Sequence, residues 1–169
     1  MSLNLRRRRQ IRRTARDLIA VASELGGPTT DDLLEASRLN AGFNSIRCAF
    51  DDLGAGIVAS TKISNGHAKI RISRHCTTVR HTLAHELGHI VLGHSLIDTT
   101  CFEAERDDCP PGFERLYLAM LPGGEQGEKD NGYSLRVEKE AEFFASEVLA
   151  ILPGVRATRA AREFMYGLA

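Results

Sequence analysis

The sequence predicts a single α+β domain in which helices pack on a small antiparallel sheet. Its 169 residues have the length of one domain, and 43% hydrophobic residues are enough to form a core. Hydrophobic residues recur with helical spacing towards both ends of the chain, and they alternate as in strands around Asn65-Gly66. We therefore treat residues 1–169 as one domain, with a basic N-terminal helix over 6–25 and a core from about 30 to 153.

The first expected element is an amphipathic helix over residues 6–25. Hydrophobic residues recur there every three or four positions, while arginines occupy the opposite face. Gly26 and Gly27 are typical of a helix end. A second helix is expected over residues 30–39, with Thr30 as its N-cap and two aspartates in its first turn.

Alternating hydrophobic residues predict strands in the centre of the chain. They cover three ranges: 45–50, 55–63 and 67–73. Asn65-Gly66 separates the last two ranges, and this dipeptide favours a two-residue hairpin turn because both residues tolerate positive φ. We expect the three strands to form a small antiparallel sheet.

The most informative stretch of the chain is His85-Glu86-Leu87-Gly88-His89. On a helix, residues four positions apart share a face, so the two imidazoles can bind one metal ion. Zinc suits imidazole and carboxylate ligands, and a catalytic zinc leaves one coordination position open for water. The carboxylate beside the two histidines can accept a proton from that water as it attacks a peptide carbonyl. The stretch therefore predicts a zinc site that hydrolyses amide bonds, with Glu86 as the general base.

The alternative is a surface helix with two solvated histidines. The surrounding sequence favours the metal site, because it predicts a helix with an apolar side over residues 78–92, ended by Gly93. His81 falls near the same face, and we expect it to pack beneath the site rather than to bind metal. His94 follows the helix and is expected to lie near the negative end of its dipole.

The C-terminal half contains one further strong helix, over residues 135–152, which Pro153 ends. Residues 95–136 are the least regular part of the chain and have a helical pattern only at 113–121. A segment of this length is usually a lid over a functional site or disordered, and the sequence does not decide between the two. Residues 155–169 could add a short terminal helix.

Two histidines need a third protein ligand to complete a zinc site. The last strong helix offers four glutamates: Glu138, Glu140, Glu142 and Glu147. Helix chemistry alone does not choose among them. Tyr133 and Arg136 precede this group and could stabilise an oxyanion, but spacing does not show where a donor points.

The two helices together resemble the ImmA/IrrE family of zinc metallopeptidases. Residues 82–89 read TLAHELGH, like the metal-binding helix of that family. Residues 138–145 read EKEAEFFA, and the family has Glu-x-x-Ala-Asn/Asp-x-Phe-Ala in its second ligand helix. The resemblance covers most of residues 30–153, and its specificity lies in the two helices taken together.

This resemblance implies a zincin-like core and one Zn²⁺ ion bound by the two histidines of the first helix and by Glu138. Glu142 stands where the family has Asn or Asp, a position expected to orient a ligating histidine through a hydrogen bond. A glutamate can accept that bond but reaches further. Glu140 and Glu147 are most simply solvated helix residues.

The resemblance further implies a cytoplasmic endopeptidase that cleaves a protein substrate. In relatives this substrate is often a helix-turn-helix transcriptional repressor linked to stress response or to a mobile element. Two alternatives stay open: a non-catalytic, metal-containing module that binds a transcription regulator, and a DNA-associated regulator that uses the arginine-rich helix. Binding alone does not require a general base such as Glu86, which argues against the first. Manganese or iron could replace zinc in the cell.

The charge pattern favours neither nucleic acid nor a membrane as a partner. Lys+Arg and Asp+Glu are equal, at 22 each. Arginines gather within residues 6–16, where a solvated helix face is favoured over a contact with nucleic acid. No apolar run is long enough to span a bilayer, and charges interrupt the place where a signal peptide has its apolar centre. We therefore expect a cytoplasmic protein.

The four cysteines show no CxxC spacing and are expected to be reduced thiols. We expect Cys48 and Cys76 to be buried. Cys101 and Cys109 could pair under oxidation or help to bind a second metal, but nothing nearby supplies further ligands at a standard spacing.

Overall fold

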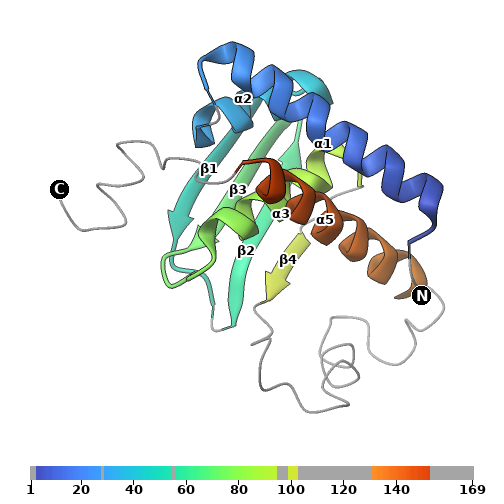
Figure 1. Cartoon of the computed structure of the whole chain (residues 1–169). Helices are drawn as coiled ribbons and strands as arrows, with labels where there is room; N and C mark the ends of the chain where they lie inside the picture. Colours follow the sequence, from blue (N-terminus) through green and yellow to red (C-terminus); the bar gives the residue numbers. More distant parts are fainter. Residues whose placement is uncertain (1–2, 28, 55, 95–98, 103–130, 153–169) are drawn as a thin grey trace.

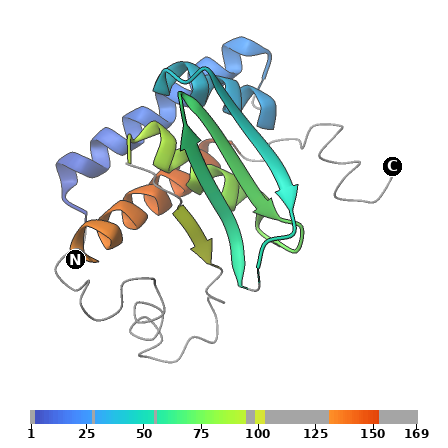
Figure 2. The same cartoon turned by 180° about the vertical axis from the view of Figure 1, so that it is seen from behind.

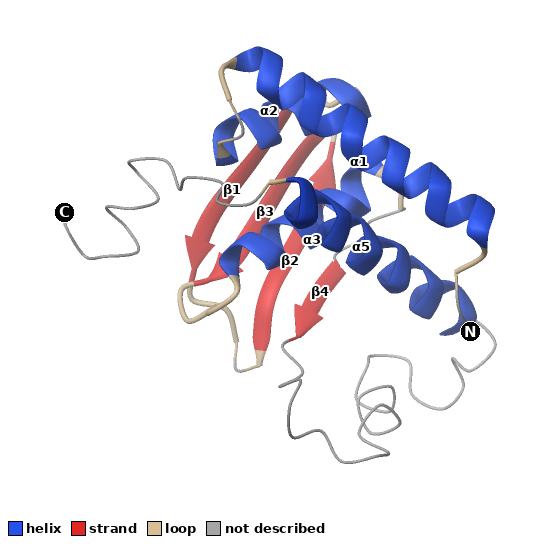
Figure 3. Cartoon of the chain, in the orientation of Figure 1, coloured by secondary structure: helices blue, strands red, loops and turns tan. Residues whose placement is uncertain are grey.

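The structure is a computed structural model that describes residues 3–27, 29–54, 56–94, 99–102 and 131–152. Its helices are α1 (Leu5–Leu25), α2 (Thr30–Ala41), α3 (Val79–Val91) and α5 (Asn131–Ile151). Its strands are β1 (Ser45–Asp51), β2 (Ile57–Ser64), β3 (His67–Ser73) and β4 (Thr99–Phe102). The helices lie on one face of the sheet, as two opposite views show (Figure 1, Figure 2). Figure 3 separates the two layers by colour. The expected α+β class is confirmed.

A reciprocal pair of hydrogen bonds determines where α2 begins. Thr29 Oγ1 accepts a bond from Asp32 N, and the Asp32 carboxylate accepts one from Thr29 N, each at 3.2 Å. The N-cap is therefore Thr29, and the prediction of Thr30 is wrong by one residue. Three positions after Thr30 stands Leu33, whose side chain cannot complete such a pair.

The sheet has the strand order β1-β3-β2-β4. β2 and β3 form the expected antiparallel hairpin, in which Ser64 is paired with His67. The turn residues Asn65 and Gly66 have φ angles of 51° and 75°. Positive φ at both central residues is what a two-residue hairpin turn of this kind requires. The hairpin prediction is confirmed.

The position of β1 corrects the expected antiparallel sheet. β1 pairs in parallel with β3, beginning at Ser45 and His67, so the sheet is mixed. A hairpin has two free edges, and the alternation of hydrophobic residues does not choose between them. β1 ends beside Ser73 at the end of β3, and β2 starts near the same end, so β1 runs parallel to β3. Asn44 N donates a hydrogen bond to Gly66 O (2.7 Å) and holds the start of β1 beside the hairpin turn.

β4 is a second difference from the expected fold. It pairs in antiparallel fashion with β2, where Thr100 lies opposite Ser60. Residues 95–136 show no alternation that would have predicted a strand. The helices expected over 113–121 and 155–169 lie outside the described residues, and so does most of the segment considered as a lid.

The core lies between the helix layer and the sheet. α1 buries residues at the predicted spacing: Ile11, Ala15, Leu18, Ile19 and Ala22. β3 buries alternate residues: Ala68, Ile70 and Ile72. α3 and α5 bury the following: Leu83, Ala84, Leu87, Ile90, Ala141, Phe144, Ala145 and Val148. α3 contacts both β2 and β3 of the sheet, and it also packs against α5. Its position joins the two layers.

Every helix in the described part of the chain is too short or too polar to cross a membrane. Cys76 is buried, as expected, and Cys48 is half-buried; both are free thiols. Burial, assisted by the negative charge of Glu86, raises the pKa of Cys48 to about 12. Cys109 lies outside the described residues, so the alternatives for Cys101 and Cys109 stay predictions.

Candidate metal centre

α3 and α5 bring three ligand groups to one place. His85 Nε2 lies 3.1 Å from His89 Nε2 and 3.1 Å from Glu138 Oε2. Glu138 Oε1 lies 3.5 Å from His89 Nε2. One ligand atom from each of the three residues lies within 4.8 Å of the others. A tetrahedral zinc ion with bonds near 2.1 Å holds its ligand atoms about 3.4 Å apart. The three groups therefore fit a metal ion of this kind.

A close contact between the two helices makes this geometry possible. At Gly88, a Cβ atom would lie 3.1 Å from Phe144 Cδ1 and 3.2 Å from Ala141 Cα. The absence of a side chain at Gly88 allows the backbone of α5 to approach α3. Glu138 stands one turn before Ala141 and so reaches His85 and His89.

The charges of the site favour a cation among the three ligands. Burial by itself lowers the pKa of His85, but the hydrogen bond to Glu138 and the nearby carboxylate of Glu142 outweigh it and raise the pKa to about 9. Burial raises the pKa of Glu138, whereas the bond to His85 and the proximity of His89 outweigh that and lower it to about 2. At neutral pH the metal-free site thus holds a proton on His85 next to an ionised Glu138. A metal ion would replace that proton.

Glu142, expected to orient a ligating histidine, lies behind His85. Its Oε2 atom is 3.6 Å from His85 Nδ1, and its Oε1 atom is 3.2 Å from His81 Nε2. The first distance is longer than a direct hydrogen bond, so Glu142 acts on His85 as a nearby negative charge. His81 contacts Glu142 and is not one of the three converging ligands.

Glu86 is fully buried beside the ligand pair, with 0% of its surface exposed. Its Oε2 atom accepts a hydrogen bond from Thr61 Oγ1 on β2, and this hydroxyl is also buried. Its Oε1 atom has no hydrogen-bond partner among the described residues. Thr61 was not identified from the sequence as a residue of the site. The available signal was a hydroxyl on the buried face of β2, two residues after the buried Ala59.

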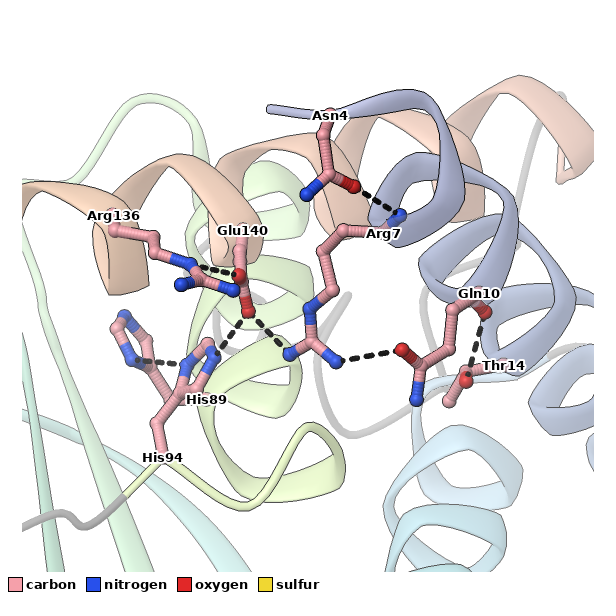
Figure 4. A network of polar contacts seen from close by, with 8 residues as sticks. All are labelled: Asn4, Arg7, Gln10, Thr14, His89, His94, Arg136 and Glu140. Carbon is pink, nitrogen blue, oxygen red and sulfur yellow. Dashed lines mark hydrogen bonds and ion pairs between the residues drawn. The ribbon is translucent and has the colours of Figure 1, made fainter. Parts of the chain in front are cut away.

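A polar network that the sequence did not reveal lies behind His89 (Figure 4). His89 Nδ1 is 3.1 Å from His94 Nδ1, and His94 Nε2 is 3.3 Å from Glu140 Oε2. Glu140 also accepts a bond from Arg136 Nε (3.0 Å) and forms an ion pair with Arg7 of α1. Burial raises the pKa of Glu140, but the bonds from these three partners outweigh it and lower the pKa to about 2.

The expectation that Glu140 is solvated is therefore wrong. Only 3% of its surface is exposed, because it faces α1 and the end of α3 rather than water. His94 does follow α3, and its backbone N–H donates a hydrogen bond to His89 O (3.0 Å). Its ring, however, contacts His89 and Glu140, and burial lowers its pKa, which favours the neutral ring. The sign of this network in the sequence was a histidine shortly after the end of α3.

The arginine-rich face of α1 is partly used for packing. Arg12 forms a two-point ion pair with Glu147 on α5, with distances of 2.7 and 2.9 Å. Glu147 is half-buried there, so the prediction of a solvated side chain is only partly correct. Arg8 lies over the ring of Phe143, 4.8 Å from its centre. The remaining arginines of α1 are exposed, as predicted: Arg6, Arg9, Arg13 and Arg16.

Neither candidate oxyanion donor gains support from its position. Arg136 donates to Glu140, and the side chain of Tyr133 lies outside the described residues.

Comparisons with known proteins give no family for this chain. No protein-family model matches it, and no curated protein or solved structure is significantly similar to it.

Proposed function

We propose that this protein is a zinc-dependent endopeptidase in which His85, His89 and Glu138 hold one zinc ion and Glu86 is the general base. The observation that carries the proposal is the convergence of the three ligand groups from two helices. The second support is a buried glutamate beside them, one of whose carboxylate oxygens has no hydrogen-bond partner in the described part of the chain.

The residues present fit the steps of amide hydrolysis. A bound zinc ion supplies Lewis-acid chemistry, because it polarises a carbonyl group and makes water more acidic. Thr61 occupies Glu86 Oε2, and Oε1 is left to accept the proton of the attacking water. Glu86 can then deliver that proton to the departing amine. Glu142 lies behind His85 as a nearby negative charge, and His94 contacts the ring of His89.

The two alternative functions gain less support. A buried carboxylate oxygen without a hydrogen-bond partner lowers the stability of the fold by about 1–3 kcal/mol or more. A module that only binds a regulator would gain nothing in return for this loss. A DNA-associated regulator would need the arginines of α1. Two of them, Arg7 and Arg12, are engaged by glutamates of α5, which reduces the charge available to phosphates.

The substrate class follows from the resemblance to the ImmA/IrrE family. We propose a cytoplasmic protein substrate, with a helix-turn-helix transcriptional repressor as the first candidate. Zinc is the proposed ion, although manganese and iron also accept imidazole and carboxylate ligands. Metal analysis of the purified protein would decide among them.

The proposal is tested by metal content and cleavage of the full chain, measured for wild type, Glu86→Gln and Glu138→Ala. The substrate is a mixture of peptides from a digested cytoplasmic proteome, in which mass spectrometry identifies new chain ends. We expect wild type to bind one zinc ion and to cleave. Glu86→Gln should bind zinc equally well and lose about 10²- to 10⁴-fold in cleavage rate. Glu138→Ala should lose stoichiometric zinc.

Glu24→Gln changes an exposed glutamate of α1 and is the matched control. Cleavage by Glu86→Gln at the wild-type rate would remove Glu86 as the base. A biological effect that survives this change would favour the non-catalytic binding module. Full zinc content in Glu138→Ala would assign the third ligand to another carboxylate.

A further inference from the structure

A line of hydrogen bonds leads from the metal-facing ring of His89 to the N-terminal helix α1 (Figure 4). It passes from His89 to His94, then to Glu140, and ends at Arg7. The first three side chains are buried: 0% of His89, 7% of His94 and 3% of Glu140 is exposed. Arg7 is itself held by Gln10, whose Oε1 accepts a bond from Arg7 Nη1 at 3.0 Å.

The line determines where each proton lies. Glu140 is paired with two arginines and is therefore an ionised group that only accepts, so His94 donates to it from Nε2. His94 Nδ1 faces His89 Nδ1 at 3.1 Å, so one of the two atoms donates and the other accepts. With its N–H at Nε2, His94 accepts at Nδ1. His89 must then donate from Nδ1. Its Nε2 atom keeps a lone pair, and this is the atom that faces the other two ligands.

We propose that His94 is a positioning residue that, held by Glu140, fixes the tautomer and the ring orientation of His89 so that Nε2 is presented to the metal. Metal-binding histidines commonly donate their other N–H to a carboxylate or a carbonyl group. Here a second imidazole stands between the histidine and the carboxylate. The inference rests on the proposed metal centre, but it does not depend on peptide hydrolysis.

The surroundings of the other ligating histidine explain why His94 is needed. Behind His85, Glu142 of α5 lies 3.6 Å from Nδ1. Glu140 comes from the same helix, and it reaches His89 through His94. His94 thus provides for His89 the support that Glu142 provides for His85. Because Arg7 belongs to α1, the N-terminal helix contributes to the position of a metal ligand.

The test is the zinc affinity of the full chain, measured without substrate by competition with a chromophoric chelator. His94→Leu removes both the acceptor and the donor while it fills a similar volume. His94→Asn keeps an acceptor oxygen near the position of Nδ1. We expect His94→Leu to weaken zinc binding by about 10- to 100-fold, and His94→Asn to recover most of that loss. His67→Asn changes an exposed histidine bonded to Ser45 and should bind zinc as wild type does.

A spectrum and an unfolding measurement separate positioning from a merely structural role. With cobalt(II) in place of zinc, the visible bands report the ligand geometry and should shift in His94→Leu. Thermal unfolding of each metal-free variant gives the loss of stability alone. If both His94 variants lose zinc affinity equally, in proportion to that loss, His94 has no positioning role.

The outcomes also separate this inference from the proposed function. Wild-type zinc affinity and an unchanged cobalt spectrum in His94→Leu would overturn the inference and leave the peptidase standing. A wild type that binds zinc but cleaves nothing would end the peptidase proposal, and the role of His94 would be unaffected. A wild type that binds no metal would overturn both.

Discussion

Gly88→Ala tests whether the metal centre depends on the close approach of α3 and α5. The new Cβ atom would lie 3.1 Å from Phe144 Cδ1, 3.2 Å from Ala141 Cα and 3.3 Å from Ala141 O. Carbon atoms in good contact lie about 3.5–4.0 Å apart. Two of the three contacts are with backbone atoms, so a different rotamer of Phe144 cannot relieve them. The two helices must therefore separate by about 0.3 Å or more.

The effect on metal binding should exceed the effect on stability. Overpacking costs about 1–3 kcal/mol, but alanine is more favourable than glycine within a helix by about 1 kcal/mol. We expect the metal-free variant to lose about 1 kcal/mol of unfolding free energy in a urea titration. Glu138, one turn from Ala141, would move away from His85 with α5. We expect zinc affinity to fall about tenfold or more, which corresponds to about 1.4 kcal/mol.

The matched control is Ser146→Ala, which also adds helix propensity but on the exposed side of α5. It should bind zinc with wild-type affinity. Gly88→Val adds a larger side chain at the same place and should weaken zinc binding further. Wild-type zinc affinity in Gly88→Ala would contradict this prediction, because Glu138 would then reach the histidines without the close helix contact.

Two further predictions concern Glu86 and His85. Thr61→Val keeps the shape of a buried side chain but removes the donor to Glu86 Oε2. A lost bond to a charged group costs about 1.5–3 kcal/mol, so kcat/KM for an identified peptide should fall about tenfold or more at unchanged zinc affinity; undiminished cleavage would contradict a role for Thr61. The pKa of His85 in the metal-free protein is about 9, so zinc must displace a proton below that pH. Chelator competition from pH 8.5 to 6.5 should show zinc affinity falling about tenfold per pH unit, whereas a constant affinity would mean that His85 is neutral before zinc binds.

Features that depend on neighbouring residues could be predicted from the sequence. The apolar spacing of α1 and the Asn65-Gly66 turn act over a few residues, and both are confirmed. The placement of His85 and His89 on one face of α3 follows from helical periodicity alone. Their Nε2 atoms face each other at 3.1 Å, as that spacing requires.

Features that depend on which elements meet could not be predicted in the same way. Alternation identifies β1 as a strand, but it does not say which edge of the hairpin β1 joins. The contact between Arg7 and Glu140 joins residues that are 133 positions apart in the chain. No local pattern indicates that such residues meet. The selection of Glu138 as a ligand likewise needed the resemblance to a known family, because four glutamates lie on one helix.

The roles of Glu138, Glu140 and Glu142 depend on the face of α5 on which each residue lies. Successive helix residues turn by about 100°, so Glu138 and Glu142 lie within about 40° of each other, while Glu140 points about 200° away. Glu138 and Glu142 therefore both reach the ring of His85, from its two nitrogen atoms. Glu140 projects instead towards α1 and is buried by Arg7. α5 is consequently held from two sides, by the close contact at Gly88 and by the ion pair with α1. A ligand helix fixed in this way keeps Glu138 in reach of the histidines, which links the N-terminal helix to the chemistry of a site far along the chain.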